Sequence, residues 1–276
     1  MKQRFTKMHG LGNDFMVIDG VTTAVNLSTL PVAALARRDT GVGFDQLLVV
    51  EPSKTRGIDF YYRIFNANGE EVGQCGNGAR CLARFIRHYG LSDKSVLTVA
   101  THTTRMTLRL NPDDTVTVDM GVPRFLPAEI PLLMPKMDDT YRLPLEEANF
   151  VDVHALSVGN PHAVLAVEDV AKAAVETLGA RISTHPLFPE GTNAGFMERV
   201  SSTLLRLRVF ERGSMETKAC GSGAAAAAVV GRRFYDMQSD ITVELPGGRL
   251  NIHWEGLEHP LLLTGPAAFV YEGVLF

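Results

Sequence analysis

The sequence predicts an α+β protein built from two similar domains, and three observations support this prediction. First, residues 63–81 (RIFNANGEEVGQCGNGARC) and 208–226 (RVFERGSMETKACGSGAAA) align without a gap, and both contain Arg-x-Phe, a glutamate and Cys-Gly-x-Gly-Ala. Second, other segments recur in the same order around them. Third, strand-like and helix-like patterns are mixed in each copy. Because there are only two copies with a long period, we expect a duplication rather than a solenoid.

The elements of the first half follow in a clear order. A Gly-Asn turn at residues 12–13 precedes an apolar run, 63 residues before Cys75, and a Gly-rich turn leads into a strand pattern at 41–50. The alternating, aromatic segment FYYRIF at 60–65 predicts another strand. After Cys75, apolar residues recur at helical spacing until Gly90, which predicts a helix.

The second half repeats this order. Its Gly-Asn turn at 159–160 lies 61 residues before Cys220, and a strand pattern follows at 191–200. The alanine-rich segment after Cys220 is a strong helix former, and its small side chains would let it pass through the centre of a sheet-built domain. The Pro-rich stretch 123–144 marks the crossing between the domains, which places their boundary near residues 119–121.

Composition and charge argue against several function classes. The 276-residue chain has a formal net charge of −4 with both signs dispersed, which indicates no basic surface for nucleic acid or membrane lipid. No apolar stretch approaches the ~18 residues of a membrane span, and the N-terminus lacks the apolar core of a signal peptide. The three cysteines, at 75, 81 and 220, have no metal-ligand spacing. We therefore expect a cytosolic protein without a metal site or disulfides.

The duplicated Cys-Gly-x-Gly segments carry the chemistry. Each cysteine stands just before a predicted helix, where unpaired backbone N–H groups and the helix dipole favour an anion such as a carboxylate. The same field would lower the pKa of the thiol. Two such thiols suit inversion of a stereocentre, because one thiolate can remove the α-proton while the other, as a thiol, protonates the opposite face. The carboxylate cradle would stabilise the carbanion as it gains enolate character.

Several alternatives compete with stereoinversion. A cysteine beside a tight turn is often buried and inert, although duplication in register argues against this. Cys81, which has no counterpart in the second copy, is expected in the core. A cysteine hydrolase could use His162 as its base, but the second thiol would then have no role. A dithiol redox enzyme would more often use a close Cys-x-x-Cys pair.

Polar side chains at turns and strand ends suggest a cage for an amino acid. Any single asparagine at such a place is more often a turn former. Five amides, however, recur at matched places around the two thiols: Asn13, Gln46, Asn66, Asn160 and Asn193. Glu211 and Arg212 replace Asn66 and Ala67 in the second copy, so the two halves differ in charge. An arginine could hold a second carboxylate, and a glutamate could hold an ammonium group.

Seven segments together identify a family. They are HGLGNDF, GVGFDQ, FNANG, QCGNGAR, GNPH, ACGSG and LPGGRL, in this order. On these motifs the chain resembles the diaminopimelate epimerases over essentially its whole length. The resemblance implies two domains, 1–119 plus 266–276 and 120–265, each a mixed sheet or barrel wrapped around a central helix, with the active site in the cleft between them. It also implies a cytosolic homodimer that needs no cofactor and interconverts LL- and meso-diaminopimelate for lysine and peptidoglycan precursor synthesis.

The resemblance further implies roles for individual residues. Cys75 and Cys220 would be the acid and base catalysts, His162 and Glu211 would tune their pKa values, and Tyr271 would lie at the dimer contact. The expected substrate-binding residues are Asn13, Gln46, Asn66, Gly76, Asn77, Asn160, Asn193, Glu211, Arg212, Gly221 and Ser222.

The chain departs from the family pattern at a few places. Met215 stands where the family usually has glycine, and Lys218 replaces a common glutamine, which affects the expected geometry of loop 213–218. THTTRM at 101–106 lacks a glycine often found there. A racemase of another amino acid, such as proline, and a binding module that has kept an old site remain alternatives. Arg212 and the amide cage favour a longer, doubly charged substrate, and intact cysteines in both copies favour catalysis.

Overall fold

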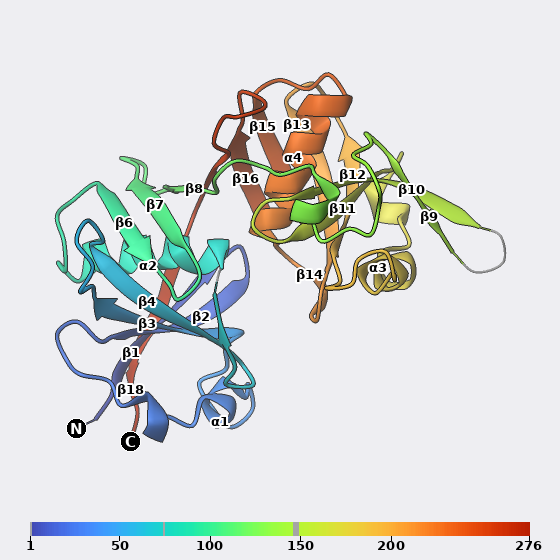
Figure 1. Cartoon of the computed structure of the whole chain (residues 1–276). Helices are drawn as coiled ribbons and strands as arrows, with labels where there is room; N and C mark the ends of the chain where they lie inside the picture. The colour runs from blue at the N-terminus through green and yellow to red at the C-terminus, as the bar shows by residue number, and fades with distance from the viewer. Residues whose placement is uncertain (1, 74, 146–148) are drawn as a thin grey trace. The chain divides into compact units, whose positions relative to one another are not determined.

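The computed structural model describes residues 2–73, 75–145 and 149–276, which form two compact units (Figure 1). The first unit comprises Met1–Val118 and Thr264–Phe276, and the second comprises Asp119–Leu263. The chain therefore leaves the first unit once and returns to it for its last strand. Each unit combines a mixed sheet with a helix that the sheet encloses, which confirms the expected α+β architecture.

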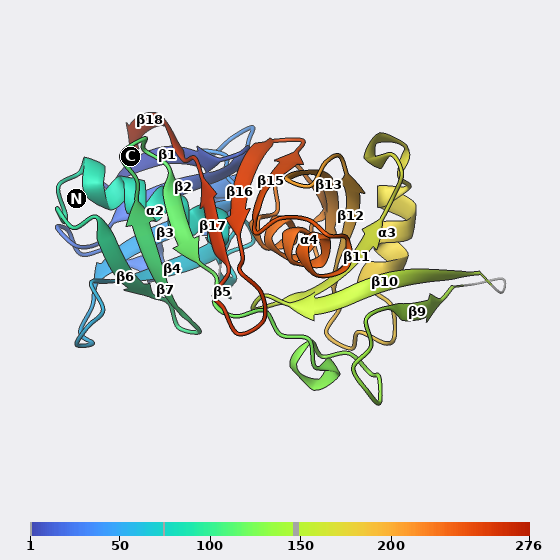
Figure 2. The same cartoon turned by 90° about the horizontal axis from the view of Figure 1, so that it is seen from above.

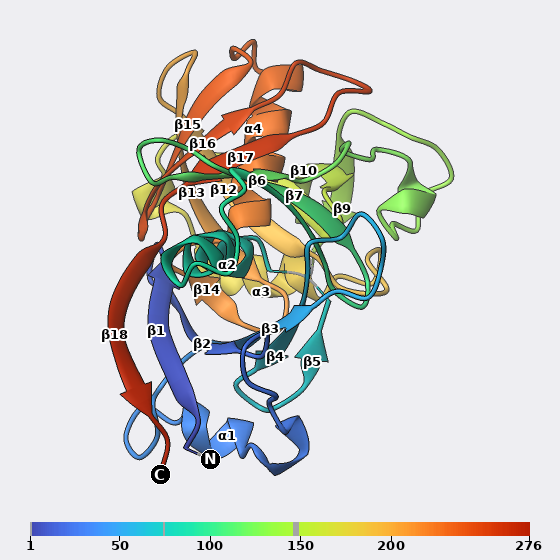
Figure 3. The same ribbon diagram turned by 90° about the vertical axis from the view of Figure 1, so that its left-hand side faces the viewer.

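The first unit mixes parallel and antiparallel strand pairs. Its strands are β1 (Arg4–Gly10), β2 (Asn13–Asp19), β3 (Gln46–Pro52), β4 (Phe60–Asn66), β5 (Glu71–Val72), β6 (Val96–Ala100), β7 (Arg105–Leu110), β8 (Val116–Asp119) and β18 (Ala268–Val274). β1 pairs with both β18 and β2, as Figure 3 shows, and β2 runs parallel to β3. β4 pairs antiparallel with β3 and β5 and parallel with β6, and β7 links β6 to β8.

The helix α2 (Gly76–His88) is enclosed by this sheet. Its residues from Asn77 to Ala83 are buried without interruption, so every side of this stretch is covered. A helix lying on a sheet surface would instead show one buried stripe. Gly78 permits the close approach, because a Cβ at this position would lie 3.3 Å from Leu48 and 3.4 Å from Phe15.

The other face of the same sheet is buried as well. A short helix, α1 (Val32–Ala36), and the 3-10 turn η1 (Leu27–Thr29) cover it. The cluster beneath them consists of Phe5, Met16, Ile18, Val32, Ala36, Phe44, Leu47, Val49 and Phe65. Leu47 and Val49 face this cluster while Leu48 packs on the α2 side, so β3 is apolar throughout, as expected for a strand buried on both faces.

The second unit repeats this plan. Its strands are β9 (Tyr141–Pro144), β10 (Phe150–Ser157), β11 (Pro161–Ala166), β12 (Asn193–Arg199), β13 (Leu204–Glu211), β14 (Met215–Thr217), β15 (Asp240–Leu245) and β16 (Gly248–His253). The chain passes back to the first unit within β17 (Leu262–Gly265). The enclosed helix is α4 (Gly221–Phe234), and Figure 2 shows it end-on with strands around it. Its buried run of alanines keeps the helix thin, which confirms the expected central position.

The strand registers show that the sequence repeat is a structural repeat. Phe15 pairs with Gln46 between parallel strands β2 and β3, and His162 pairs with Asn193 between parallel strands β11 and β12. α3 (Val175–Ser183) and the 3-10 turn η4 (Val170–Lys172) lie between β11 and β12, where the first unit has α1 between β2 and β3. Equivalent residues are thus brought to equivalent places by the same backbone hydrogen bonds.

The Pro-rich stretch 123–144 is more than a crossing between domains. It contains the 3-10 turn η2 (Pro127–Glu129) and strand β9, which pairs antiparallel with β10. Ile130 and Leu143 from this stretch are fully buried in the core of the second unit. The stretch therefore belongs to the second unit, because its apolar residues need that core. Among the described residues, no helix has the length and apolar character needed to cross a membrane.

Candidate active site

Cys75 occupies the N-cap of α2, as the sequence predicted. Its backbone is extended (φ −153°, ψ 107°), and its Sγ accepts a hydrogen bond from the N–H of Gly78 at 3.3 Å. One of the otherwise unpaired N–H groups of the first helical turn is thus directed at the sulfur. The side chain is only half-buried, so the thiol lies at the surface end of an otherwise enclosed helix.

Two predicted binding residues, Asn13 and Asn77, lie together beside Cys75 in the first unit. Asn77 Nδ2 donates to Asn13 Oδ1 at 3.1 Å, and the same oxygen lies 3.9 Å from Cys75 Sγ. Asn13 Nδ2 in turn donates to Asp45 Oδ2 at 2.9 Å. The polar atoms around Cys75 are therefore held by one another before any substrate is present.

Gln46 and Asn66 form a second polar pair of the first unit. They are cross-strand partners on β3 and β4, and Gln46 Nε2 donates to Asn66 Oδ1 at 2.9 Å. Gln46 Oε1 is buried and has no hydrogen-bond partner among the described residues. A buried carbonyl oxygen without a donor is unusual in a native protein, so this atom is available to a ligand or to water.

Cys220 repeats the geometry of Cys75 at the start of α4. It is the N-cap residue (φ −110°, ψ 108°), and its Sγ accepts a hydrogen bond from the N–H of Gly223 at 3.4 Å. The Ser222 hydroxyl lies 3.6 Å from the sulfur. Glycine is required at position 223, because a Cβ there would lie 2.9 Å from Val209 and 3.2 Å from the Cys220 sulfur.

The surroundings of Cys220 raise the pKa of its thiol well above the usual value. Burial is the largest cause, and the nearby Glu211 carboxylate acts in the same direction, while Ser222 and the N–H of Gly223 act against it. The expectation that the helix start lowers the thiol pKa is therefore wrong for Cys220. Loss of hydration and a neighbouring negative charge outweigh the field of the helix.

His162 is fully buried beside Asn160. Burial lowers the pKa of His162 to about 3, and the charge of Arg212 acts in the same direction, so the imidazole is neutral at neutral pH. Asn160 Nδ2 donates to Ser222 Oγ at 3.4 Å, and His162 Nε2 lies 3.1 Å from Asn160 Oδ1 and 3.5 Å from Asn193 Nδ2. His162 Nδ1 is buried without a hydrogen-bond partner among the described residues.

Asn193, Glu211 and Arg212 complete the predicted set in the second unit. Asn193 Oδ1 accepts the backbone N–H of Arg212 at 2.9 Å, and Arg212 Nη1 donates to the carbonyl oxygen of Glu190 at 2.6 Å. Glu211 Oε1 accepts a hydrogen bond from the Thr217 hydroxyl. The side chain of Arg212 is exposed, so its guanidinium could exchange a backbone carbonyl for a ligand carboxylate.

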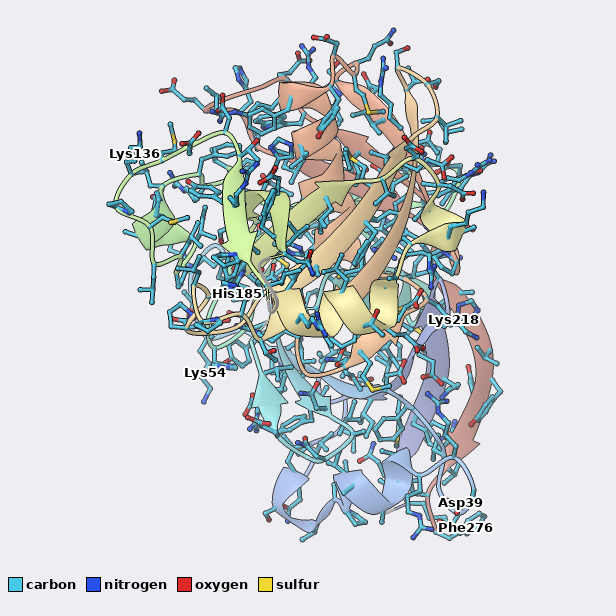
Figure 4. The ribbon with its side chains drawn as sticks, turned by 90° about the vertical axis from the view of Figure 1, so that its right-hand side faces the viewer. Asp39, Lys54, Lys136, His185, Lys218 and Phe276 are labelled. Carbon is cyan, nitrogen blue, oxygen red and sulfur yellow. The ribbon has the colours of Figure 1, made fainter. Side chains whose placement is uncertain are left out.

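The loop before Cys220 has the geometry that the family's glycine would favour. Met215 adopts a positive φ of 63° and exposes 67% of its surface. Gly213 in the same loop also has a positive φ, of 78°. Lys218, two residues before Cys220, is exposed and is labelled in Figure 4. The methionine at position 215 therefore costs backbone strain that a glycine would avoid.

Two ion pairs, one before each cysteine, were not predicted from the sequence. Arg63 binds Glu71 through Nε at 2.9 Å and Nη2 at 2.6 Å, and Arg208 binds Glu216 through Nε at 2.7 Å and Nη2 at 2.8 Å. They fasten β5 to β4 and β14 to β13, just before each cysteine. The repeat could have revealed both ion pairs, because the arginine and the glutamate that the two copies share are the two partners.

The third cysteine lies in the core, as predicted. Cys81 is fully buried within α2, and burial raises the pKa of its thiol to about 12. Among the described residues, no group of three or more histidine, cysteine or carboxylate side chains is arranged to hold a metal ion.

Solved structures share the fold of this chain. A hydroxyproline epimerase from Agrobacterium vitis matches with a TM-score of 0.71 and 13% identity, and the match covers 99% of this chain and 92% of that one. A phenazine biosynthesis protein of the PhzF family from Bacillus anthracis matches with a TM-score of 0.69 and 16% identity, covering 100% and 99%. At such low identity the likeness concerns the fold alone.

Sequence comparison establishes the family. The family described as diaminopimelate epimerase matches residues 5–126 and 154–270. Diaminopimelate epimerases of Legionella pneumophila strains Corby and Philadelphia 1 are each 58% identical to this chain over 272 residues, covering 99% of this chain and 98% of theirs. The chain belongs to the diaminopimelate epimerase family, and the resemblance seen in its motifs is confirmed.

Proposed function

We propose that this protein is an isomerase that converts LL-2,6-diaminopimelate to meso-diaminopimelate without pyridoxal phosphate, for lysine and peptidoglycan precursor synthesis. The observation that carries the proposal is the pair Cys75 and Cys220, each an N-cap residue whose sulfur accepts a helical N–H. The identity of 58% with diaminopimelate epimerases, over nearly the whole chain, supports the substrate.

The reaction consists of two proton transfers at one α-carbon. One thiolate takes the α-proton and becomes a thiol, and the electron pair of the broken C–H bond moves into the carboxylate as enolate character. The other thiol then gives its proton to the opposite face and becomes a thiolate. One turnover thus exchanges the charge states of the two sulfurs, and proton exchange with water restores them. The mechanism requires both thiols to reach the same carbon.

The two thiols begin the reaction in different states. The raised pKa of Cys220 keeps this thiol protonated at neutral pH, so we assign it the role of proton donor in one direction of the reaction. Cys75 is then the base in this direction. In the reverse direction the roles are exchanged, as microscopic reversibility requires.

The backbone amides at the two helix starts, those of Gly76, Asn77, Gly221 and Ser222, would bind the carboxylate at the reacting carbon and stabilise its enolate character. Arg212 and Glu211 supply an opposite-charge pair suited to a second, distant carboxylate and ammonium group. The amides of Asn13, Gln46, Asn66, Asn160 and Asn193 would bind the remaining polar atoms of the substrate. His162 and Glu211 would tune the thiol pKa values.

The test is turnover in deuterated water with single cysteine variants. We expect one deuterium at the inverted α-carbon of the product, and loss of turnover in both directions for Cys75→Ala and for Cys220→Ala. Cys81→Ala is the matched control and keeps its activity, because this cysteine lies in the core. Near-normal turnover by either catalytic variant would disprove the two-base mechanism.

Substrate identity needs a separate comparison. Assaying diaminopimelate and proline side by side distinguishes an epimerase of a long, doubly charged substrate from a proline racemase. Binding of diaminopimelate without deuterium incorporation would instead identify a binding module. We further propose that the protein is a cytoplasmic homodimer, and that Tyr271 on β18 lies at the dimer contact.

A further inference from the structure

Arg80 is a buried cation that no predicted role accounts for. Its side chain on α2 has no exposed surface. The guanidinium donates from Nε to the carbonyl oxygen of Pro266 at 3.1 Å, from Nη1 to that of Gly76 at 3.4 Å, and from Nη2 to Asn77 Oδ1 at 3.0 Å. In the described part of the chain, no carboxylate forms an ion pair with it. Burying such a charge is costly, so its presence calls for a function.

The fold makes room for this side chain. A Cβ on Gly10, at the end of β1, would lie 3.1 Å from Arg80 Nη2 and 3.4 Å from Asn77. The glycine of the HGLGN segment and the arginine of the QCGNGAR segment are therefore packed against each other. Two motifs that are far apart in the sequence serve the same contact.

Arg80 begins a series of hydrogen bonds whose direction is fixed. Arg80 donates to Asn77, Asn77 Nδ2 donates to Asn13 Oδ1 at 3.1 Å, and Asn13 Nδ2 donates to Asp45 Oδ2 at 2.9 Å. An arginine can only donate and a carboxylate can only accept, so neither amide in between can turn around. We call these four residues the Arg80–Asp45 network. It places Asn13 Oδ1, 3.9 Å from Cys75 Sγ, in one orientation.

The second unit lacks this network. In the repeat, Ala225 stands at the place of Arg80 and Ser222 at the place of Asn77. Thr192 precedes Asn193, as Asp45 precedes Gln46. The second unit therefore has no arginine at the place of Arg80 and no carboxylate at the place of Asp45. The network is therefore a property of the Cys75 half and not of the shared scaffold.

We propose that Arg80 and Asp45 are positioning residues of the Cys75 half-site: together they fix the orientation of Asn13 and Asn77, and the buried charge of Arg80 favours the thiolate of Cys75. The inference rests on the proposed function, in which Cys75 is the base while Cys220 is the proton donor. The two halves are then electrostatically opposite, with a cation behind Cys75 and the Glu211 carboxylate beside Cys220.

Other charged groups near Cys75 balance one another. Arg38 pairs with Asp14 at 2.8 Å and with Asp45 at 2.7 Å, and Lys7 also pairs with Asp14. Cys81 and the buried hydroxyl of Tyr62 also interact electrostatically with Cys75, and burial raises the pKa of both, so they stay neutral. Burial lowers the pKa of Arg80 while the charges of Cys81 and Cys75 raise it, and a guanidinium keeps its proton under these conditions.

The test measures the ionisation of Cys75 directly. The rate of Cys75 alkylation by iodoacetamide is followed against pH in full-length protein with Cys220→Ala, while buried Cys81 stays unreactive. We expect Arg80→Gln to move the midpoint of this profile upward by about one pH unit, because a nearby cation favours the thiolate. Arg80→Lys should restore part of the shift, since it returns the charge without the planar fork.

Arg84→Gln is the matched control. Arg84 lies one turn further along α2, donates to the carbonyl oxygen of Ala267 at 3.3 Å and pairs with Asp114, but does not touch Asn77. Its loss removes a cation from the same helix and should leave the profile unchanged. An equal shift in both variants, or no shift in folded Arg80→Gln, would overturn the role of the charge.

Asp45→Asn keeps the proposal testable if Arg80→Gln does not fold. Its side chain is 42% exposed, and Arg38 keeps its bonds to Asp14, so the fold should tolerate the change. An amide at position 45 can donate as well as accept, so Asn13 and Asn77 are no longer held in one orientation, and we expect kcat/KM to fall about tenfold. Unchanged kcat/KM would refute the positioning role. Turnover by Cys75→Ala would instead refute the proposed function and leave the alkylation result standing.

Discussion

The two cysteines proposed as catalysts differ at the level of single residues, although the sequence makes them look alike. Both cap a helix and both accept one N–H, but Cys220 is buried beside Glu211 while Cys75 is half-buried near Arg80. The repeat identifies the thiols and their glycines, because these lie within a few residues of each other. It cannot give the raised pKa of Cys220, which depends on burial and on partners brought in by other strands.

Removing the charge of Glu211 should make Cys220 more acidic. The carboxylate disfavours a nearby thiolate, so Glu211→Gln should move the midpoint of the alkylation profile of Cys220 downward by about one pH unit. Burial, the larger cause, remains, so the pKa stays above its usual value. The profile is measured in Cys75→Ala protein. Glu168→Gln, at an exposed site of the same unit, is the control, and an unchanged midpoint in Glu211→Gln would contradict the assignment.

At the level of elements, each unit repeats one segment, in which a strand pair is followed by a helix capped by a cysteine. In each unit a strand carries an arginine, a short partner strand carries the glutamate that binds it, and the helix with its cysteine follows. Alternation and turn signals could predict these elements because each is local. The Pro-rich stretch was misjudged, since the burial of Ile130 and Leu143 depends on strands that come later in the chain.

The turn at Met215 is the strained point of this segment in the second unit. A positive φ costs a non-glycine residue about 1 kcal/mol. The free energy of unfolding of Met215→Gly, measured with urea, should therefore exceed that of Met215→Ala by about this amount. Alanine is the matched control because it removes the exposed side chain but keeps the penalty. Equal stabilities of the two variants would mean that the strain is relieved elsewhere in the loop.

At the level of the whole molecule, β18 carries the proposed dimer contact. It pairs with β1 and exposes Val270, Tyr271 and Val274. The ring of Tyr271 packs edge-on against Phe5, with ring centroids 6.0 Å apart. An exposed strand with apolar side chains is a natural surface for a second copy of the chain. That the C-terminal strand returns to the first unit was implied by the family resemblance, since nothing local in the sequence reveals its partner.

Tyr271→Ala tests the dimer. Truncating this aromatic anchor should shift the protein from a dimer to a monomer at micromolar concentration in sedimentation velocity, because large aromatic side chains dominate the binding energy of interfaces. Phe150→Ala removes an aromatic residue that is even more exposed, in the second unit, and should leave the mass unchanged. A variant at Tyr271 that stays dimeric would place the contact on another surface.

The burial of Cys81 gives the protein an internal reporter of unfolding. Of the three cysteines, it alone has no proposed chemical role, and its thiol has no exposed surface and a pKa of about 12. A thiol reagent can label it only when α2 separates from the strands around it. The rate of that labelling therefore measures how often the first unit opens, without any engineered probe, in the same sample in which the thiols of Cys75 and Cys220 are counted.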